Sequence, residues 1–260
     1  MPRTCSSSER LLLSFSRKPG SNDYCTVSEA RDPDTALCLL CRVFPDFLPS
    51  IAGKEILDFG CGEGRQAVAM ACSGATYVWG LDVSRRLLIS ARSLALEVGV
   101  EKQVDFTDRL EARFRARFDI VISQNSMEHF PDPAKALEEM KSALKPDGRL
   151  LITFGPPWLA PFGSHMHFFT KVPWVHLIFS EKTVMAVRSH FRHDGATRYE
   201  DVEGGLNKMT AGRFERLVSS GGMQILYKKY ECVKGINILA RVPLTRELFI
   251  NRVSCILAWQ

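Results

Sequence analysis

Residues 56–65 constrain the fold of this chain more than any other segment, and they read Ile-Leu-Asp-Phe-Gly-Cys-Gly-Glu-Gly-Arg. An apolar run ends in Asp58, alternating glycines follow, and residues 65–72 then have a helical composition. Glycine lets the backbone take a positive φ and come close to a ligand, since no Cβ stands in the way. The start of a helix offers free N–H groups and a positive dipole end to an anion. The segment therefore predicts a strand, a tight turn and a helix, with an anionic small molecule lying across the turn.

Two classes of ligand bind turns of this kind, and the residue spacing separates them. A dinucleotide site has the pattern G-x-G-x-x-G, with an acid about 20 residues further on. This chain instead reads D-x-G-x-G-x-G, and Arg65 takes the place of the third glycine of a dinucleotide site. Asp58 is placed to face a cation, and Asp82, after a second strand over residues 76–81, can accept hydrogen bonds from a ribose. S-adenosylmethionine, which has an ammonium, a carboxylate and a ribose, fits these features.

Six sequence blocks in a fixed order carry a resemblance to a known family. They are Ile56–Gly64, Gly80–Ser84, Phe106–Asp108, Phe118–Ser123, Met127–Pro133 and Leu144–Ile152. With these blocks the chain resembles the class I S-adenosylmethionine-dependent methyltransferases. It is most similar to the group that methylates small metabolites (methyltransferase type 11, with the ubiquinone and menaquinone biosynthesis types). The blocks lie within residues 54–155, and their joint occurrence is far more specific than a glycine turn alone.

The resemblance and the alternation of strand and helix patterns predict an α/β fold. We expect a Rossmann-like, doubly wound sheet of seven strands, mostly parallel, that closes with a C-terminal antiparallel hairpin. Residues 1–30 are polar and lack periodicity, so we expect a flexible N-terminal segment there. Residues 31–260 are expected to form a single methyltransferase domain, in which residues 155–206 are an insertion after strand five that serves as a substrate lid.

The expected elements follow from apolar periodicity and from turn residues. We expect strands near residues 55–59, 76–81, 102–107, 118–123, 149–154, 224–233 and 252–259, and helices near residues 35–48, 64–73, 84–98, 133–145 and 210–220. The first of these helices is expected to cap the sheet or to cover the site. Residues 145–148, Lys-Pro-Asp-Gly, have the composition of a turn.

The resemblance also implies which residues hold the cofactor. They are Asp58, Phe59, Gly60, Cys61, Gly62, Gly64, Asp82, Val83, Asp108, Arg109 and Gln124. Asp58 would bind the amino group of the cofactor, directly or through water, or else cap a helix. Asp82 would take the ribose hydroxyls or merely cap the helix that begins at Ser84. Asp108 would contact the adenine amino group, although the basic run over residues 109–117 departs from the pattern of the family.

Three histidines are candidates for a catalytic base, which the reaction needs only if the methyl acceptor must lose a proton. In an extended segment alternate residues share a face, so the rings of His165 and His167 would point into one pocket. Surface or packing roles are the alternative for this pair. His129 follows the fourth strand at the edge where ligands bind in such folds, and its alternative is a structural or cofactor-lining role. No further ligand stands nearby at metal-site spacing, so no metal is expected.

Eight aromatic residues lie in the insertion between Trp158 and Tyr199. They predict either an apolar lid over the substrate or a small core that holds the insertion together, and both can hold at once. Residues 172–179, Val-Pro-Trp-Val-His-Leu-Ile-Phe, suggest a third role, contact with a membrane surface that presents a lipid-linked substrate. The expected partner is thus a small molecule, aromatic or lipid-linked.

Composition limits the other partners. The net charge is +5, and no basic stripe with interleaved aromatics is present, so we expect no nucleic acid partner. No apolar run approaches the roughly 18 residues of a membrane-spanning helix. Cys38 and Cys41 form a Cys-x-x-Cys pair, but no second pair stands at zinc-site spacing. We therefore expect buried free thiols and a cytoplasmic protein.

The leading hypothesis is an S-adenosylmethionine-dependent methyltransferase that acts on a small molecule, with methylation of oxygen favoured over nitrogen or carbon. A cofactor-binding regulator, or an inactive partner without turnover, is the alternative from a different class, since fold alone does not prove catalysis. A nucleic-acid or protein methyltransferase is less favoured. Base-modifying enzymes carry a Pro-Pro-Tyr-like turn after strand four, where this chain has Gln124–Met127.

Overall fold

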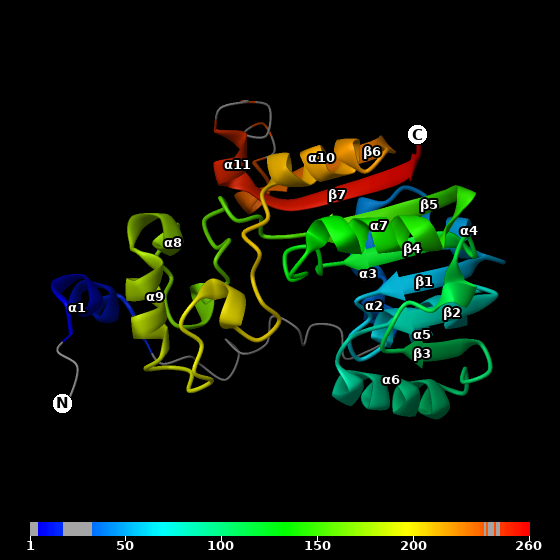
Figure 1. Ribbon diagram of the computed structural model, residues 1–260, viewed down its shortest axis with the longest axis horizontal. Coiled ribbons are helices and arrows are strands. Elements are labelled where there is room, and N and C mark those ends of the chain that lie inside the picture. Colours follow the sequence, from blue (N-terminus) through cyan, green and yellow to red (C-terminus); the bar gives the residue numbers. More distant parts are fainter. Residues whose placement is uncertain (1–4, 18–32, 237, 239–241, 243–244) are drawn as a thin grey trace.

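A seven-stranded sheet forms the centre of the molecule (Figure 1). The computed structural model describes residues 5–17, 33–236, 238, 242 and 245–260. The strands are β1 (Glu55–Phe59), β2 (Tyr77–Leu81), β3 (Val104–Thr107), β4 (Phe118–Gln124), β5 (Leu144–Phe154), β6 (Met223–Cys232) and β7 (Ile250–Trp259). Their order is β3-β2-β1-β4-β5-β7-β6, with β1 to β5 parallel and β7 antiparallel to both β5 and β6. The expected doubly wound sheet with a C-terminal antiparallel hairpin is confirmed.

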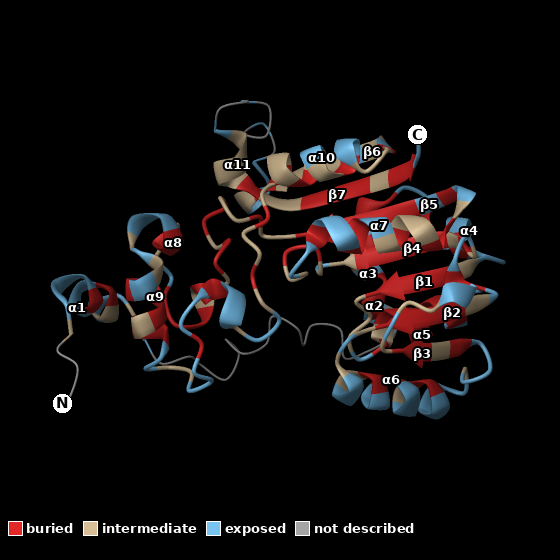
Figure 2. Cartoon of the chain, in the orientation of Figure 1, coloured by how far each residue is buried: buried red, intermediate tan, exposed pale blue. Residues whose placement is uncertain are grey.

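Two layers of helices bury the two faces of this sheet, because successive strand residues point to opposite sides. Ile56 packs on the face covered by α5 (Arg65–Cys72) and α6 (Arg85–Val98). Leu57 packs on the face covered by α7 (Pro133–Ala143) and α10 (Ala211–Ser220). Figure 2 shows the strands as mostly buried and the outer side of α6 as exposed.

The first helix of the domain differs from the expectation of one helix over residues 35–48. The chain instead forms three short helices, α2 (Pro33–Ala36), α3 (Cys38–Val43) and α4 (Phe47–Ile51). Phe44 is extended, with φ −109° and ψ 124°, as the residue before a proline usually is. Pro45 therefore ends α3, and this proline in the sequence is a signal that predicts such a break.

A second body of structure projects from the carboxyl edge of the sheet (Figure 1). It contains α1 (Ser7–Ser14), η3 (Met166–Phe168), α8 (Val175–Ile178), α9 (Glu181–Arg188) and η4 (Tyr199–Asp201), and we call α1 with residues 156–206 the insertion lobe. Ser6 caps α1 in a capping box with Glu9, and the α1 residue Leu12 is fully buried against the lobe. The N–H of Arg17 donates to the carbonyl of Phe169 over 2.9 Å. The segment expected to be flexible thus contains a packed helix, and residues 1–4 and 18–32 lie outside the described residues.

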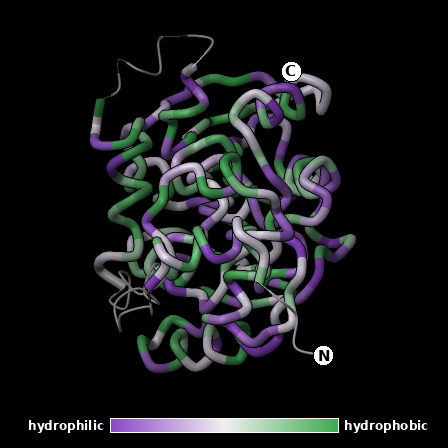
Figure 3. Tube along the Cα trace, turned by 90° about the vertical axis from the view of Figure 1, so that its left-hand side faces the viewer, coloured by the Kyte–Doolittle hydropathy of each residue, from purple (hydrophilic) through white to green (hydrophobic). Residues whose placement is uncertain are grey.

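The insertion lobe has an apolar core of its own. Phe168, Phe169 and Tyr199 are buried there with Leu12 and Val184. Many of the aromatic residues in the insertion therefore hold the lobe together, as the second of the two expectations proposed. Figure 3 views the molecule from the side of this lobe and shows hydrophobic and hydrophilic stretches interleaved along the chain.

One detail of the sheet differs from the expectation. Residues 145–148 belong to β5 and not to a turn, because the pairing shifts from Phe118 opposite Leu144 to Ile120 opposite Arg149. β5 therefore has more residues than β4 over this stretch, and the additional residues form an irregularity within the strand. The connection from β6 to β7 contains η5 (Val233–Gly235) and α11 (Arg246–Phe249).

The expectation of buried thiols is correct for Cys232 and Cys255 but wrong for Cys38, Cys41 and Cys72, which are exposed. Cys38 and Cys41 stand three residues apart in α3, so they share its outer side, while Leu40 and Val43 are buried on the other side. In the part of the chain that the structure describes, no helix is long and apolar enough to cross a membrane.

Candidate active site

The glycine turn joins β1 to α5, and its three glycines have positive φ angles of 86°, 53° and 74°. A Cβ on Gly60 would lie 2.6 Å from Ser126 Oγ, and a Cβ on Gly64 would lie 2.6 Å from Ala91 Cβ. Around Gly62, in contrast, no atom of the described residues lies within 4 Å of where a Cβ would be. Gly60 and Gly64 are therefore required for packing, whereas Gly62 faces open space where a ligand can approach the backbone.

Asp82 links the end of β2 to this turn. Its carboxylate accepts one hydrogen bond from the N–H of Gly62 and another from the N–H of Ser84, both over 2.9 Å. Asp82 thereby fixes the N–H of Ser84, the N-cap residue of α6, whose own side chain makes no capping hydrogen bond. It also stands directly beside the open glycine, where it can accept hydrogen bonds from a ligand with its remaining lone pairs.

Asp58 is a buried carboxyl group at the end of β1. Gln66, from the first turn of α5, donates to its Oδ1 over 3.0 Å, while Oδ2 is buried without a hydrogen-bond partner among the described residues. Burial, and after it the nearby charge of Asp82, raises the pKa of Asp58 to about 7. A cationic ligand group would satisfy the unpartnered oxygen and favour the ionised form. The contribution of Gln66 was missed by sequence reasoning, since only the fold brings it to Asp58.

Other predicted cofactor residues differ in exposure. Phe59 is buried in the core with its ring edge-on to Phe130, so only its backbone can border the turn. Val83 is 86 % exposed, beyond Asp82, and can offer an apolar surface to a ligand. Burial, followed by the charges of Asp58 and Asp82, raises the pKa of the Cys61 thiol, so Cys61 is not a thiolate nucleophile.

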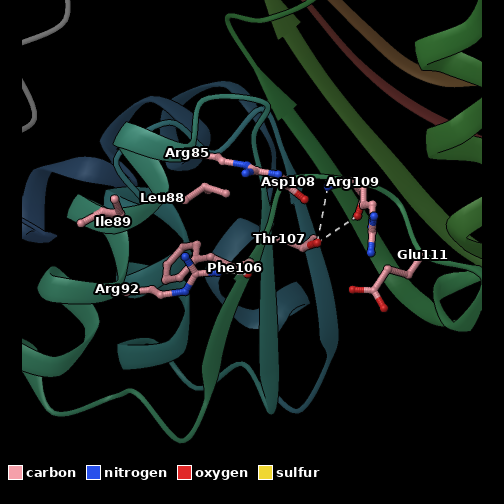
Figure 4. A pocket seen from close by; sticks show the side chains of 9 residues that line it. All are labelled: Arg85, Leu88, Ile89, Arg92, Phe106, Thr107, Asp108, Arg109 and Glu111. Atoms are coloured by element: carbon pink, nitrogen blue, oxygen red, sulfur yellow. Dashed lines mark hydrogen bonds and ion pairs between the residues drawn. The ribbon is translucent and has the colours of Figure 1, made fainter.

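A pocket of about 370 Å³ lies between α6 and the end of β3 (Figure 4). It is lined by Arg85, Leu88, Ile89, Arg92, Phe106, Thr107, Asp108, Arg109 and Glu111. Arg85 reaches across its mouth and forms an ion pair with Asp108, with Nε 2.9 Å from Oδ2. The structure thus places Asp108 and Arg109 together at the β3 end, and it gives Asp108 an arginine partner that sequence reasoning missed.

The structure brings two of the three candidate histidines together. The rings of His129 and His165 meet edge to face, with centroids 5.4 Å apart. The Nδ1 of His129 is 2.7 Å from the carbonyl oxygen of Gly205 and donates to it, which leaves Nε2 as the accepting nitrogen of the neutral ring. Burial, and then the neighbouring His129 and His167, lowers the pKa of His165 to about 3. His165 is therefore neutral near pH 7.

His167 does not share a face with His165, so the expectation based on an extended segment is wrong. His165 has a positive φ of 57° and η3 follows it at once. In a 3₁₀ turn, with three residues per turn, residues two apart point in different directions. The ring of His167 instead lies near Phe162, with centroids 6.4 Å apart.

Glu128 is a residue of the site to which the sequence analysis gave no role. It is 3 % exposed, and its Oε1 accepts a hydrogen bond from the N–H of Gly155 over 3.0 Å. Its Oε2 is buried and has no partner in the described ranges. Burial raises the pKa of Glu128, and the nearby charges of His129 and Arg252 act against that rise. The only sequence signal was its position next to His129.

Comparison with known proteins decides the family. The family model of the methyltransferase domain matches residues 33–227 of the 260-residue chain. This chain belongs to the methyltransferase domain family. Within the described residues, no group of three or more His, Cys, Asp or Glu side chains is arranged to hold a metal ion.

Curated relatives match part of this methyltransferase-family protein. A ubiquinone biosynthesis O-methyltransferase of Azotobacter vinelandii is 38 % identical over 107 residues, which are 40 % of this chain and 45 % of that protein. A protein of the same name from Salmonella paratyphi A is 33 % identical over 127 residues, 46 % of this chain and 52 % of that protein. The chain thus spans about half the length of the curated relatives that it matches.

Solved structures resemble most of the fold. An S-adenosylmethionine-dependent methyltransferase from Mesorhizobium loti has a TM-score of 0.58 at 21 % identity, over 87 % of this chain and 99 % of that chain. Geranyl diphosphate methyltransferase, solved in complex with SAM, has a TM-score of 0.58 at 16 % identity, over 88 % of this chain and 85 % of that chain. At these identities the likeness concerns the fold.

Proposed function

We propose that this protein binds S-adenosylmethionine across the glycine turn and transfers its methyl group to an oxygen atom of a small molecule. The observation that carries the proposal is the unpartnered, buried Oδ2 of Asp58 beside the open space at Gly62. These residues fit the cofactor, because Asp58 would hold its ammonium group and the N–H groups of the turn would face its carboxylate. Asp82 would hold the ribose, and the pocket at Asp108 and Arg109 would take the adenine.

When bound, the cofactor supplies an electrophilic methyl group next to a positively charged sulfur. The protein then has to hold the acceptor in line and to receive the proton that a hydroxyl acceptor loses. We assign the proton to Nε2 of His129, whose Nδ1 is engaged by Gly205. The carboxyl group of Glu128 stabilises the resulting imidazolium. His165, which burial keeps neutral, orients the acceptor, and His167 has no assigned role.

The chemistry of the acceptor follows from these groups. A neutral imidazole can take a proton from a hydroxyl whose pKa is not far above its own, so the acceptor is a phenol or an enol more readily than an alcohol. The aromatic side chains of the insertion lobe favour a ring or an acyl chain on the acceptor. Lipid-linked acceptors belong to the same class.

One experiment tests the proposal. The protein is incubated with S-adenosylmethionine labelled on the methyl group and with a small-molecule cell extract, and labelled products are separated. The wild type is expected to label a discrete product, and Asp82→Ala to label none. His129→Asn is expected to lower the rate by about 100-fold or more at unchanged cofactor affinity. Cofactor binding without any labelled product would support the alternative of a regulator.

A further inference from the structure

Three polar side chains form a row across neighbouring strands next to the proposed cofactor site. Gln124 of β4 pairs with Thr153 of β5, and Thr153 pairs in turn with Ser254 of β7. Residues directly opposite one another in a sheet point to the same face, about 4.8 Å apart. The three side chains therefore stand side by side on one face, near the carboxyl ends of β4 and β5.

One polar oxygen of each side chain in the row is buried and unsatisfied. Thr153 and Ser254 have no exposed surface, and Gln124 Oε1, Thr153 Oγ1 and Ser254 Oγ have no hydrogen-bond partner in the described part of the chain. A buried hydroxyl without a partner costs roughly 1–3 kcal/mol. On the side of Leu151 and Ile256 the face is apolar, so Val and Ala would satisfy the packing there. On the other side lie Arg252 and Lys229, and Lys229 pairs directly with Ser254.

The position of the row points to the methyl acceptor. Asp58 pairs with Ile122, which stands two residues before Gln124 in β4, so Asp58 points to the same face as the row. From Asp58 and Gln124 the row leads across β5 to β7, away from the glycine turn. A ligand that contacts Thr153 and Ser254 would thus lie beyond the cofactor and not within its site.

Short helices from the N-terminal part of the domain cover this face. Tyr227 and Glu231 of β6 share the face with Ser254 through their pairing with β7. Phe44, which ends α3, meets Tyr227 with ring centroids 6.5 Å apart, and Arg42 of α3 lies 3.8 Å from Glu231. α3 has only six residues and no side-chain hydrogen bond at its N-cap, so the burial of Leu40 and Val43 is what holds it on this face. Movement of α3 would open the row to a ligand.

We propose that Thr153 and Ser254, with Gln124, form a subsite that binds a second oxygen function of the methyl acceptor, a hydroxyl or a carbonyl. This inference rests on the proposed function, since the reacting oxygen is placed by His129 and the cofactor. The subsite selects acceptors that carry a second oxygen function in addition to the one that reacts. It holds the second oxygen while the first one reacts.

Two probes that differ by one hydroxyl test the subsite. Phenol and hydroquinone, which carries an additional hydroxyl across the ring, are titrated into the protein saturated with S-adenosylhomocysteine, and binding is followed by ligand-observed NMR. The wild type is expected to bind hydroquinone about fivefold or more tightly than phenol, as one additional hydrogen bond provides. Thr153→Val and Ser254→Ala are each expected to reduce this preference to below about twofold.

Ser123→Ala is the matched control. Ser123 is also fully buried with an unpartnered Oγ within the described residues, but it precedes Gln124 and so points to the opposite face. Its replacement is expected to leave the preference for hydroquinone unchanged. Equal binding of both probes to the wild type, binding of neither, or an unchanged preference in Thr153→Val and Ser254→Ala would each overturn the inference.

The binding of S-adenosylhomocysteine separates this inference from the proposed function. Thermal stabilisation by S-adenosylhomocysteine is measured first for every variant, and it is expected to be the same in the wild type, Thr153→Val and Ser254→Ala. Loss of stabilisation in the wild type would contradict the proposed function itself. Normal stabilisation with no preference between the probes would contradict only the subsite.

Discussion

His165 packs edge-on against His129, with ring planes at 76°, and the two imidazoles have opposite surroundings. His165 is half-buried, its Nε2 is buried without a partner among the described residues, and its pKa is lowered to about 3. His129 is held by the carbonyl of Gly205 and adjoins the buried carboxyl group of Glu128. The same contact thus joins a histidine that its surroundings keep neutral to the residue that we propose as the proton acceptor.

The pH dependence of folding is expected to show two opposite slopes. Asp58 has a folded pKa of about 7, above that of the unfolded chain, so its contribution to stability is present below about pH 4 and is lost as the pH rises to 7. His165 has a folded pKa of about 3, below that of the unfolded chain, so its contribution makes stability rise with pH up to about 6.5. The two contributions oppose each other between about pH 4 and 6.5.

Substitution of Asp58 or His165 separates their two contributions to the pH dependence of the free energy of unfolding. Relative to the wild type, Asp58→Asn is expected to make the free energy of unfolding rise more steeply with pH in this range, and His165→Asn is expected to make it fall. Urea unfolding of the empty protein at pH 4.5, 5.5 and 6.5 measures both. Parallel curves for the three proteins would show that the two groups have ordinary pKa values.

Substitution of Gly62 is expected to affect mainly cofactor affinity, whereas substitution of Gly64 is expected to affect mainly stability. Gly62→Ala and Gly64→Ala both place a side chain at positive φ, which costs about 1–2 kcal/mol. Only Gly64→Ala also forces a Cβ against Ala91 and Phe106, which costs about 1–3 kcal/mol more. Gly62→Ala is therefore expected to be the more stable variant but to lose cofactor affinity. Chemical denaturation measures the stability of both variants, and calorimetric titration measures their cofactor affinity. A larger loss of stability in Gly62→Ala than in Gly64→Ala would contradict the prediction.

The ion pair over the pocket is expected to be dispensable. The side chain of Arg85 is 85 % exposed, so its removal is expected to change stability by less than about 0.5 kcal/mol. Arg85→Ala should leave cofactor affinity unchanged or raise it, because Asp108 is then free for the adenine. Asp108→Ala should lower affinity by about tenfold, the value of a hydrogen bond to a charged group. If both variants weaken binding equally in calorimetric titrations, Asp108 acts only as the partner of Arg85.

The N-terminal helix is expected to stabilise the insertion lobe. Leu12 is fully buried against the lobe core, and Leu12→Ala should cost about 2–5 kcal/mol there. The neighbouring Leu11 is 52 % exposed and serves as the control, with little effect expected from Leu11→Ala. Hydrogen exchange in α9 reports the difference. Unchanged protection in Leu12→Ala would mean that α1 does not support the lobe.

The sequence predicted the sheet and the glycine turn well because their signals are local. The apolar run before Asp58 and the glycines after it define strand, turn and helix within a few residues. Pro45 is also a local signal, and it divides the first helix.

The insertion lobe could not be derived in the same way. A short helix such as α1 is marginal by itself, and it depends on burying Leu12 against residues far along the chain. The direction of His167 depends on the positive φ of His165, for which the sequence carries no signal. Likewise, the buried contact between Asp58 and Gln66 depends on how α5 packs against the end of β1.

Calorimetric titration of S-adenosylmethionine into the wild type, Asp82→Ala and Glu101→Ala tests the central claim most directly. The wild type is expected to bind one equivalent. Asp82→Ala should bind about 100-fold more weakly or worse, because two hydrogen bonds to a charged group are lost. Glu101, an exposed acid in the loop before β3, is the control, and Glu101→Ala should bind as the wild type does. No saturable binding to the wild type, or equal binding to Asp82→Ala, would contradict the account.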